Sequence, residues 1–146
     1  NITEDDIEKY IGVSKEYNIF ELQYAISKKD LAKAVKIIQY FDANPKAAPV
    51  QLLLPSLYNY FSKMIVLYQM SDKSEKALRP LFFNNPILVQ QAVDTLLNYS
   101  YSETEQVIIL LHEYNLKSIG INNNYAMGGS LLKELIYKII KGVSWS

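Results

Sequence analysis

Apolar residues recur at helical spacing along almost the whole chain, and this periodicity limits the possible folds more than any other feature. No stretch of six or more residues alternates cleanly between apolar and polar side chains, as a half-buried strand does. Near the C-terminus, for example, the aliphatic side chains form one stripe along a helix: Leu131, Leu132, Leu135, Ile136, Ile139 and Ile140. The pattern predicts an all-α fold, a bundle of about seven helices preceded by one short helix.

Capping residues divide this periodic pattern into separate helices. Asn18, followed three residues later by Glu21, predicts the start of a helix that ends at Lys28-Lys29, and Asp30 caps the next helix. The connection between these two helices is so short that they must form an antiparallel hairpin. Other helix starts are expected at the following residues: Thr3, Ser74, Pro86, Ser102 with its capping-box partner Glu105, and Ser130.

The longest helix is expected to run from Pro49 to about Met70. Pro49 suits the first turn of a helix, where its missing N–H has no intrahelical partner to lose. Pro55 lies inside the run, where it removes one backbone hydrogen bond and crowds the preceding turn. We therefore expect either a kink at Pro55 or a helix start just before it.

The chain has 146 residues, which is the size of a single domain. We assign residues 15–141 to the helical bundle, residues 1–14 to the last helix of a preceding domain plus a linker, and residues 142–146 to a disordered tail. The first residues are acidic and include neither an initiator methionine nor a signal-peptide pattern. We therefore expect the chain to be a piece of a longer protein.

The composition argues against several classes of function. Cysteine is absent, which excludes disulfides, thiolate catalysis and cysteine metal sites. No apolar run reaches the roughly eighteen residues that a membrane-spanning helix needs, and a cytoplasmic protein is the simplest expectation. Fifteen basic residues balance fifteen acidic ones, and this neutrality argues against direct binding to nucleic acid, which usually requires a basic excess.

Few residues in the sequence suit catalysis. His112 is the only histidine and has no second histidine for a metal site, so we expect an ordinary surface or boundary position. Asp5 and Asp6 are adjacent and point about 100° apart on a helix, so they suit the positive helix end better than paired acid–base chemistry. Gly128-Gly129-Ser130 lacks the spacing and the lysine of a phosphate loop. We predict no catalytic, cofactor-binding or metal-binding residue, and hence a non-enzymatic binding domain.

The sequence is rich in tyrosine, with twelve residues of this type. Tyr58, Phe61 and Tyr68 follow one side of the long predicted helix. Three interpretations are open: core packing, a protein interface, which suits a side chain with an apolar body and a polar tip, and stacking on single-stranded nucleic acid. The third is the least favoured because Lys63 is the only cation near these rings.

Three parts of the chain resemble the delta subunits of bacterial DNA polymerase III clamp loaders. Residues 17–34 read Y-N-I-F-E-L-x-x-A-I and then Asp30 and Ala34, which is similar to the signature that opens the collar domain of the family. Ile2-Thr3 with Ile7-Glu8 is similar to the helix that closes the preceding lid domain. Residues 113–120 and 131–139 resemble the closing helices, although the family often carries an acidic residue at the position of Asn115 and a lysine at that of Ile119.

The resemblance implies a non-catalytic collar domain, with the end of the lid domain in residues 1–14. In this family the collar holds the clamp-loader ring together beside a motor subunit and the delta-prime subunit, while other modules reach DNA and the sliding clamp. No cofactor and no membrane are implied, although the parent holoenzyme is a DNA-directed DNA polymerase. We expect the subunit interface on the exposed side of the last two helices, around the following residues: Tyr114, Lys117, Tyr137 and Lys141.

Two other functions remain open. A stand-alone helical adaptor would bind a short amphipathic peptide in an apolar groove beside the long helix, lined by Tyr58, Phe61 and Tyr68. A small helical enzyme, such as a lyase or hydrolase, would need convergent polar groups in a pocket, which the sequence does not offer. The adaptor requires a groove, whereas the collar requires a broad face and folded partners.

Overall fold

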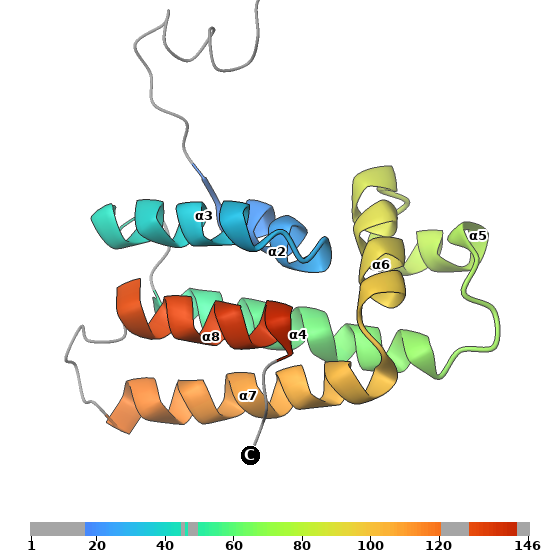
Figure 1. Cartoon of the computed structure of the whole chain (residues 1–146). Helices are drawn as coiled ribbons and strands as arrows, with labels where there is room; N and C mark the ends of the chain where they lie inside the picture. Colours follow the sequence, from blue (N-terminus) through green and yellow to red (C-terminus); the bar gives the residue numbers. More distant parts are fainter. Residues whose placement is uncertain (1–16, 45, 47–49, 121–128, 143–146) are drawn as a thin grey trace, which may run out of the picture.

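The computed structural model describes residues 17–44, 46, 50–120 and 129–142, and within them it is all-α and contains no strand (Figure 1). The predicted short helix near Thr3, the assignment of residues 1–14 and the tail after Gly142 lie outside these residues. The elements are α2 (Ile19–Ser27), α3 (Leu31–Ala43), α4 (Val50–Tyr68), α5 (Glu75–Leu78), the 3₁₀ turn η1 (Arg79–Phe82), α6 (Pro86–Asn98), α7 (Tyr101–Gly120) and α8 (Gly129–Lys141). The prediction of an all-α bundle of about seven helices is confirmed.

The hairpin of α2 and α3 forms where its capping residues predict it. The Asn18 side chain accepts a hydrogen bond from the backbone N–H of Glu21 at 2.9 Å, and Asp30 accepts one from the N–H of Lys33 at 3.1 Å. Between the helices Lys29 takes the left-handed conformation, with φ 56°, and so reverses the chain within three residues. Both caps are therefore confirmed by the structure.

The long helix α4 continues through Pro55, which lies six residues into its span of Val50–Tyr68. The predicted start at Pro49 lies outside the described residues. With 19 residues, α4 is slightly shorter than α7, which has 20. Within the residues that the structure describes, α4 is therefore not the longest helix, because α7 begins earlier and ends later than its apolar stripe indicates.

The capping box of α7 is formed by Ser100 and Glu103. The Ser100 hydroxyl accepts from the N–H of Glu103 at 3.1 Å, and the N–H of Ser100 donates to the Glu103 carboxylate at 2.9 Å. This second bond is the main reason why the pKa of Glu103 is lowered. The predicted pair of Ser102 and Glu105 is wrong: the same three-residue spacing occurs two residues earlier, and the helix starts there.

This assignment gives a direct test of where α7 begins. Replacing Ser100 by alanine is expected to lower the free energy of unfolding by about 1 kcal/mol, because the N–H of Glu103 loses its acceptor. Ser102 is exposed inside the helix, so its replacement by alanine should change the free energy by no more than about 0.5 kcal/mol. Urea denaturation of both variants measures the difference, and a larger loss for Ser102 would contradict the assigned cap.

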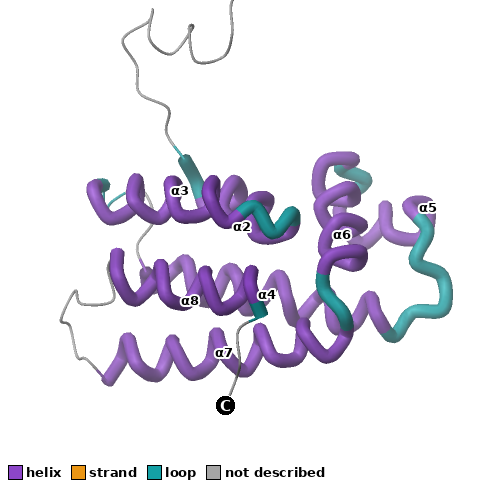
Figure 2. The backbone as a smooth tube through the Cα atoms, viewed as in Figure 1, coloured by secondary structure: helices purple, strands orange, loops and turns teal. Residues whose placement is uncertain are grey.

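The helices enclose two adjoining hydrophobic cores. The larger core is built by α2, α3, α7, α8 and the first part of α4, and it includes Tyr99. The smaller core lies between the end of α4, α5, η1 and α6, and contains Met64, Leu67, Leu78, Phe82, Val89 and Ala92. In the view of Figures 1 and 2, α6 stands across the direction of α3, α7 and α8, with α5 beyond it. Because α4 contributes to both cores, it connects the two parts of the molecule.

Polar contacts from the end of α2 and the α2–α3 turn reach α6, α7 and Tyr99 between them. Two ion pairs reach from the α2–α3 turn: Lys28 to Asp94 of α6 at 3.1 Å, and Lys29 to Glu103 of α7 at 3.3 Å. The Tyr99 hydroxyl donates to the backbone carbonyl of Ile26 at 2.6 Å. The same carbonyl accepts from the Lys29 N–H at 3.0 Å, so the Tyr99 hydroxyl is a second donor to a carbonyl at the end of α2.

Candidate interaction site

The expected interface residues on α7 and α8 differ in exposure. Lys117 and Lys141 are exposed and the Tyr137 side chain is 46% exposed, whereas Tyr114 is fully buried. Tyr114 follows Val107 on the core side of α7, so its side chain is not part of the outer surface. Of the four residues, the structure therefore leaves three available for contact with another protein.

Two lysine side chains lie close to the buried Tyr114 ring. The Lys117 ammonium lies 4.5 Å from the centroid of the ring and that of Lys138 lies 5.3 Å from it. Lys138 also pairs with Glu134 at 3.2 Å, one turn earlier on α8. Burial raises the pKa of the Tyr114 phenol, so it stays un-ionised at neutral pH. The ring is thus flanked by one cation from α7 and one from α8.

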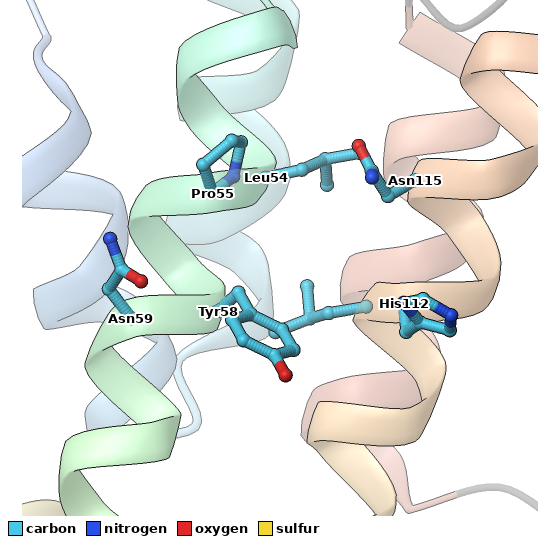
Figure 3. Close-up of a pocket in the computed structure, with 7 residues that line it drawn as sticks. Leu54, Pro55, Tyr58, Asn59, His112 and Asn115 are labelled. Carbon is cyan, nitrogen blue, oxygen red and sulfur yellow. The ribbon is translucent and has the colours of Figure 1, made fainter.

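A hollow of about 200 Å³ lies between α4 and α7 (Figure 3). Leu54 and Tyr58 extend from α4 toward α7, where Asn115 and His112 stand. The remaining lining residues are Pro55, Asn59 and Leu111. The hollow is smaller than the roughly 300–1,000 Å³ of most small-molecule sites, and its walls combine aliphatic surface with neutral polar groups. Its dimensions suit one inserted side chain better than a substrate.

The three aromatic residues predicted to line one groove do not lie together. Phe61 is fully buried, with its ring centroid 5.4 Å from that of Tyr60 and 5.5 Å from that of Tyr99. The Tyr68 hydroxyl donates to the carbonyl of Leu96 at 3.2 Å, so this side chain is directed toward α6. Tyr58 alone lines the hollow beside α4. The tyrosines that the structure describes therefore divide between core and surface positions and do not form one binding strip.

The described residues give no sign of a metal centre, since they contain no group of three or more His, Asp or Glu side chains placed to hold an ion. His112 is exposed at the hollow, next to neutral side chains. Among the helices that the structure describes, none combines the length and the apolar character needed to cross a membrane.

The sequence alone does not reveal the hollow because its two walls come from segments more than fifty residues apart. On α4 the spacing of Leu54 and Tyr58 shows that they share a helix face, and on α7 the same holds for Leu111 and Asn115. The spacing along one helix does not show which other helix packs against it.

Comparison with protein-family models, curated proteins and solved structures finds no match to this chain. What defines the molecule is thus its own geometry: an all-α domain with exposed helix faces.

Proposed function

We propose that this chain is a non-catalytic oligomerisation domain, the collar of a DNA polymerase III delta subunit. In this proposal it holds the clamp-loader ring together in the bacterial cytoplasm, so that the ring can load the sliding clamp during DNA replication. Its partners are the collar domains of the motor subunit and of the delta-prime subunit. DNA and the sliding clamp are reached through other modules of the loader.

The observation that carries the proposal is the correspondence between the opening signature and the α2–α3 hairpin. The residues of the signature divide cleanly into caps and core: Asn18 and Asp30 cap the helices, while Leu22, Ala25 and Ile26 are at most 1% exposed. A packing signature of this kind is expected to specify how the hairpin sits on the bundle. The resemblance therefore concerns residues that cap the two helices and pack in the core.

The closing helices add a surface suited to a folded partner. On α8 the exposed residues Glu134, Tyr137 and Lys141 lie on one side, opposite the buried stripe that packs against α3 and α7. Tyrosine is enriched in protein interfaces because its ring buries a large apolar area while its hydroxyl keeps a polar contact. A rigid helix face of this type fits a scaffolding role.

The test is assembly measured by light scattering on a gel-filtration column. The chain is mixed with the collar domains of the motor and delta-prime subunits, and we expect a mixed complex of defined stoichiometry. Replacing Tyr137 by alanine should weaken the complex at least about tenfold without lowering the melting temperature, because the side chain is half exposed. Tyr58, which is 41% exposed on α4, provides the matched control, and its replacement by alanine should leave assembly intact.

A helical adaptor remains the second candidate, and the hollow between α4 and α7 is the observation that favours it. In that case one side chain of a bound peptide would enter the hollow beside Tyr58 and His112. The two variants then change roles: replacing Tyr58 abolishes peptide binding and replacing Tyr137 has no effect. An intact loader in which Tyr137→Ala assembles as the wild type does would contradict the assignment of the collar interface to α8.

A further inference from the structure

The outer side of α7 carries two negative charges with an apolar side chain between them. Glu105, Ile109 and Glu113 follow one another at four-residue steps, so they share one helix face, which we call the α7 strip. Both glutamates are exposed, and Ile109 is 58% exposed. From Tyr101 to Leu116 the helix contains three glutamates and neither lysine nor arginine, so this face of α7 is anionic.

The two carboxylates of the α7 strip are not neutralised by a neighbouring cation. Across the residues that the structure describes, no ion pair joins either of them to a lysine or to the arginine. Lys117 lies one turn after Glu113, but its ammonium is directed to the Tyr114 ring, 4.5 Å from the centroid. The third glutamate of α7, Glu103, differs because it pairs with Lys29 at 3.3 Å. The α7 strip therefore offers two carboxylates to a cationic partner.

The outer side of α8 carries the opposite charge at the same spacing. Lys133, Tyr137 and Lys141 also follow one another at four-residue steps and form the α8 strip. Lys141 is exposed, Tyr137 is 46% exposed and Lys133 is half-buried. Within the described part of the chain neither lysine of the strip has an ion pair, because Glu134, the only carboxylate of α8, pairs with Lys138 at 3.2 Å. The α8 strip is therefore cationic.

The two strips match in spacing and are opposite in charge. Each places one large side chain between two charges of the same sign, and each extends over about 12 Å of helix, since eight residues rise about 1.5 Å each. Two α7 strips would repel each other, as would two α8 strips, whereas an α7 strip attracts an α8 strip. The match holds for parallel and antiparallel helices, because each strip has a charge at both ends. Within one molecule both strips face solvent, so they do not cover each other.

We propose that the α7 strip binds the α8 strip of a second copy of this chain, with Ile109 against Tyr137 between two pairs of opposite charges. The strips belong to different helices, so the contact is head-to-tail and each dimer keeps one free strip of each kind. Larger species therefore form at higher concentration. Two short helix faces bury little surface, so we expect a dissociation constant on the order of 100 μM. This inference goes beyond the proposed collar function and does not rest on it.

The first experiment measures the average mass of the whole chain by sedimentation equilibrium, up to about ten times that dissociation constant. In low salt the wild type should pass from monomer to dimer and then to larger species. About 0.5 M sodium chloride should reverse this association, because salt screens exposed charges. Glu105→Lys with Glu113→Lys opposes two cationic strips, and Lys133→Glu with Lys141→Glu opposes two anionic strips. Each double variant should raise the dissociation constant at least about tenfold, and since none of the four side chains belongs to a hydrophobic core, the fold should be preserved.

The matched control is Lys76→Glu with Arg79→Glu. Both side chains are exposed, on α5 and η1, which lie beyond α6 and away from α8 (Figure 1). The control has the same net charge as Lys133→Glu with Lys141→Glu, because each variant exchanges two cations for two carboxylates. It should associate as the wild type does. If it lost association to the same extent, net charge and not the pairing of the strips would control the association, and the proposal would be wrong.

A mixing experiment tests the pairing of the two strips directly. Neither charge-reversed double variant should associate alone, because each opposes charges of one sign. Mixed in equal amounts they should associate as the wild type does, since the reversed α7 strip of one is complementary to the reversed α8 strip of the other. A single chain with all four reversals should also associate with itself, for the same reason. A wild type that stays monomeric, a double variant that associates as the wild type does, or a mixture and a fourfold variant that both stay monomeric would each overturn the proposal.

Discussion

Replacing Phe61 by alanine is expected to lower the free energy of unfolding by about 3–5 kcal/mol, the largest effect of any single change considered. The Phe61 side chain is fully buried and makes edge-to-face contacts with Tyr60 and Tyr99. Tyr60 packs against both hydrophobic cores, so the cavity left by the missing ring opens where the two cores adjoin. Neighbouring helices constrain its collapse, which places the loss in the upper part of the range.

Urea denaturation measures this loss, and the best control is Tyr58 on the same helix. Tyr58 is 41% exposed, so its replacement by alanine should cost no more than about 1 kcal/mol. The comparison also bears on the adaptor, because an apolar groove lined by Phe61 would make this residue a binding residue. If a Phe61→Ala variant folded as stably as the wild type but failed to bind a peptide, the result would support a groove lined by Phe61 and contradict its buried position.

The features that could be predicted from the sequence are those determined by residues close together along the chain. Asn18 and Asp30 cap their helices through bonds to residues three positions later, and the turn between them is too short for any arrangement other than a hairpin. The apolar stripe of α8 likewise identifies its buried face, and the structure buries all but Leu131 of the six residues predicted there. Local hydrogen bonding and helical periodicity are sufficient for these elements.

Other features depend on choices between equivalent local patterns. Ser100-Glu103 and Ser102-Glu105 have the same spacing, and only the path of the chain after α6 decides that the first pair caps α7. The burial of Tyr114 is a similar case, because a tyrosine beside Lys117 suits either an interface or a core edge. Periodicity shows which residues share a helix face, but it does not show which face is covered by another helix.

The exposure of Phe83 could not be predicted, for a different reason. The run Leu81-Phe82-Phe83 suggests a buried apolar segment, and two adjacent aromatic residues give no indication of which one enters the core. The left-handed conformation at Phe83 decides it: Phe82 is 4% exposed and Phe83 is 87% exposed. Phe rarely adopts the left-handed conformation, so backbone preferences alone would not predict this conformation at Phe83.

Alkaline pH is expected to destabilise the fold through Tyr60. Burial raises the pKa of the Tyr60 phenol from 10.0 to about 12, and the nearby Asp94 acts in the same direction, while hydrogen bonding with Thr95 and Gln91 partly opposes the shift. The hydroxyl lies 2.6 Å from the Thr95 hydroxyl, so ionisation would leave a phenolate among groups that already share one hydrogen-bond network. Burial raises the pKa of Tyr99 further still.

Because the folded-state pKa exceeds the unfolded value, the folded protein holds the phenolic proton more tightly than the unfolded chain does. The stabilisation from Tyr60 is therefore complete below pH 10 and is lost as the pH rises toward 12, and a shift of about two pKa units corresponds to about 3 kcal/mol. Urea denaturation between pH 9 and pH 12, compared for the wild type and Tyr60→Phe, isolates this contribution, since the lysines and the other tyrosines titrate in both proteins. Tyr60→Phe should lose less stability over that range, because its ring has no proton to release. If the two proteins lost stability in parallel, the Tyr60 hydroxyl would have to reach solvent in the folded state. The contact between α4 and α6 that buries this hydroxyl would then be looser than its hydrogen bond to Thr95 implies.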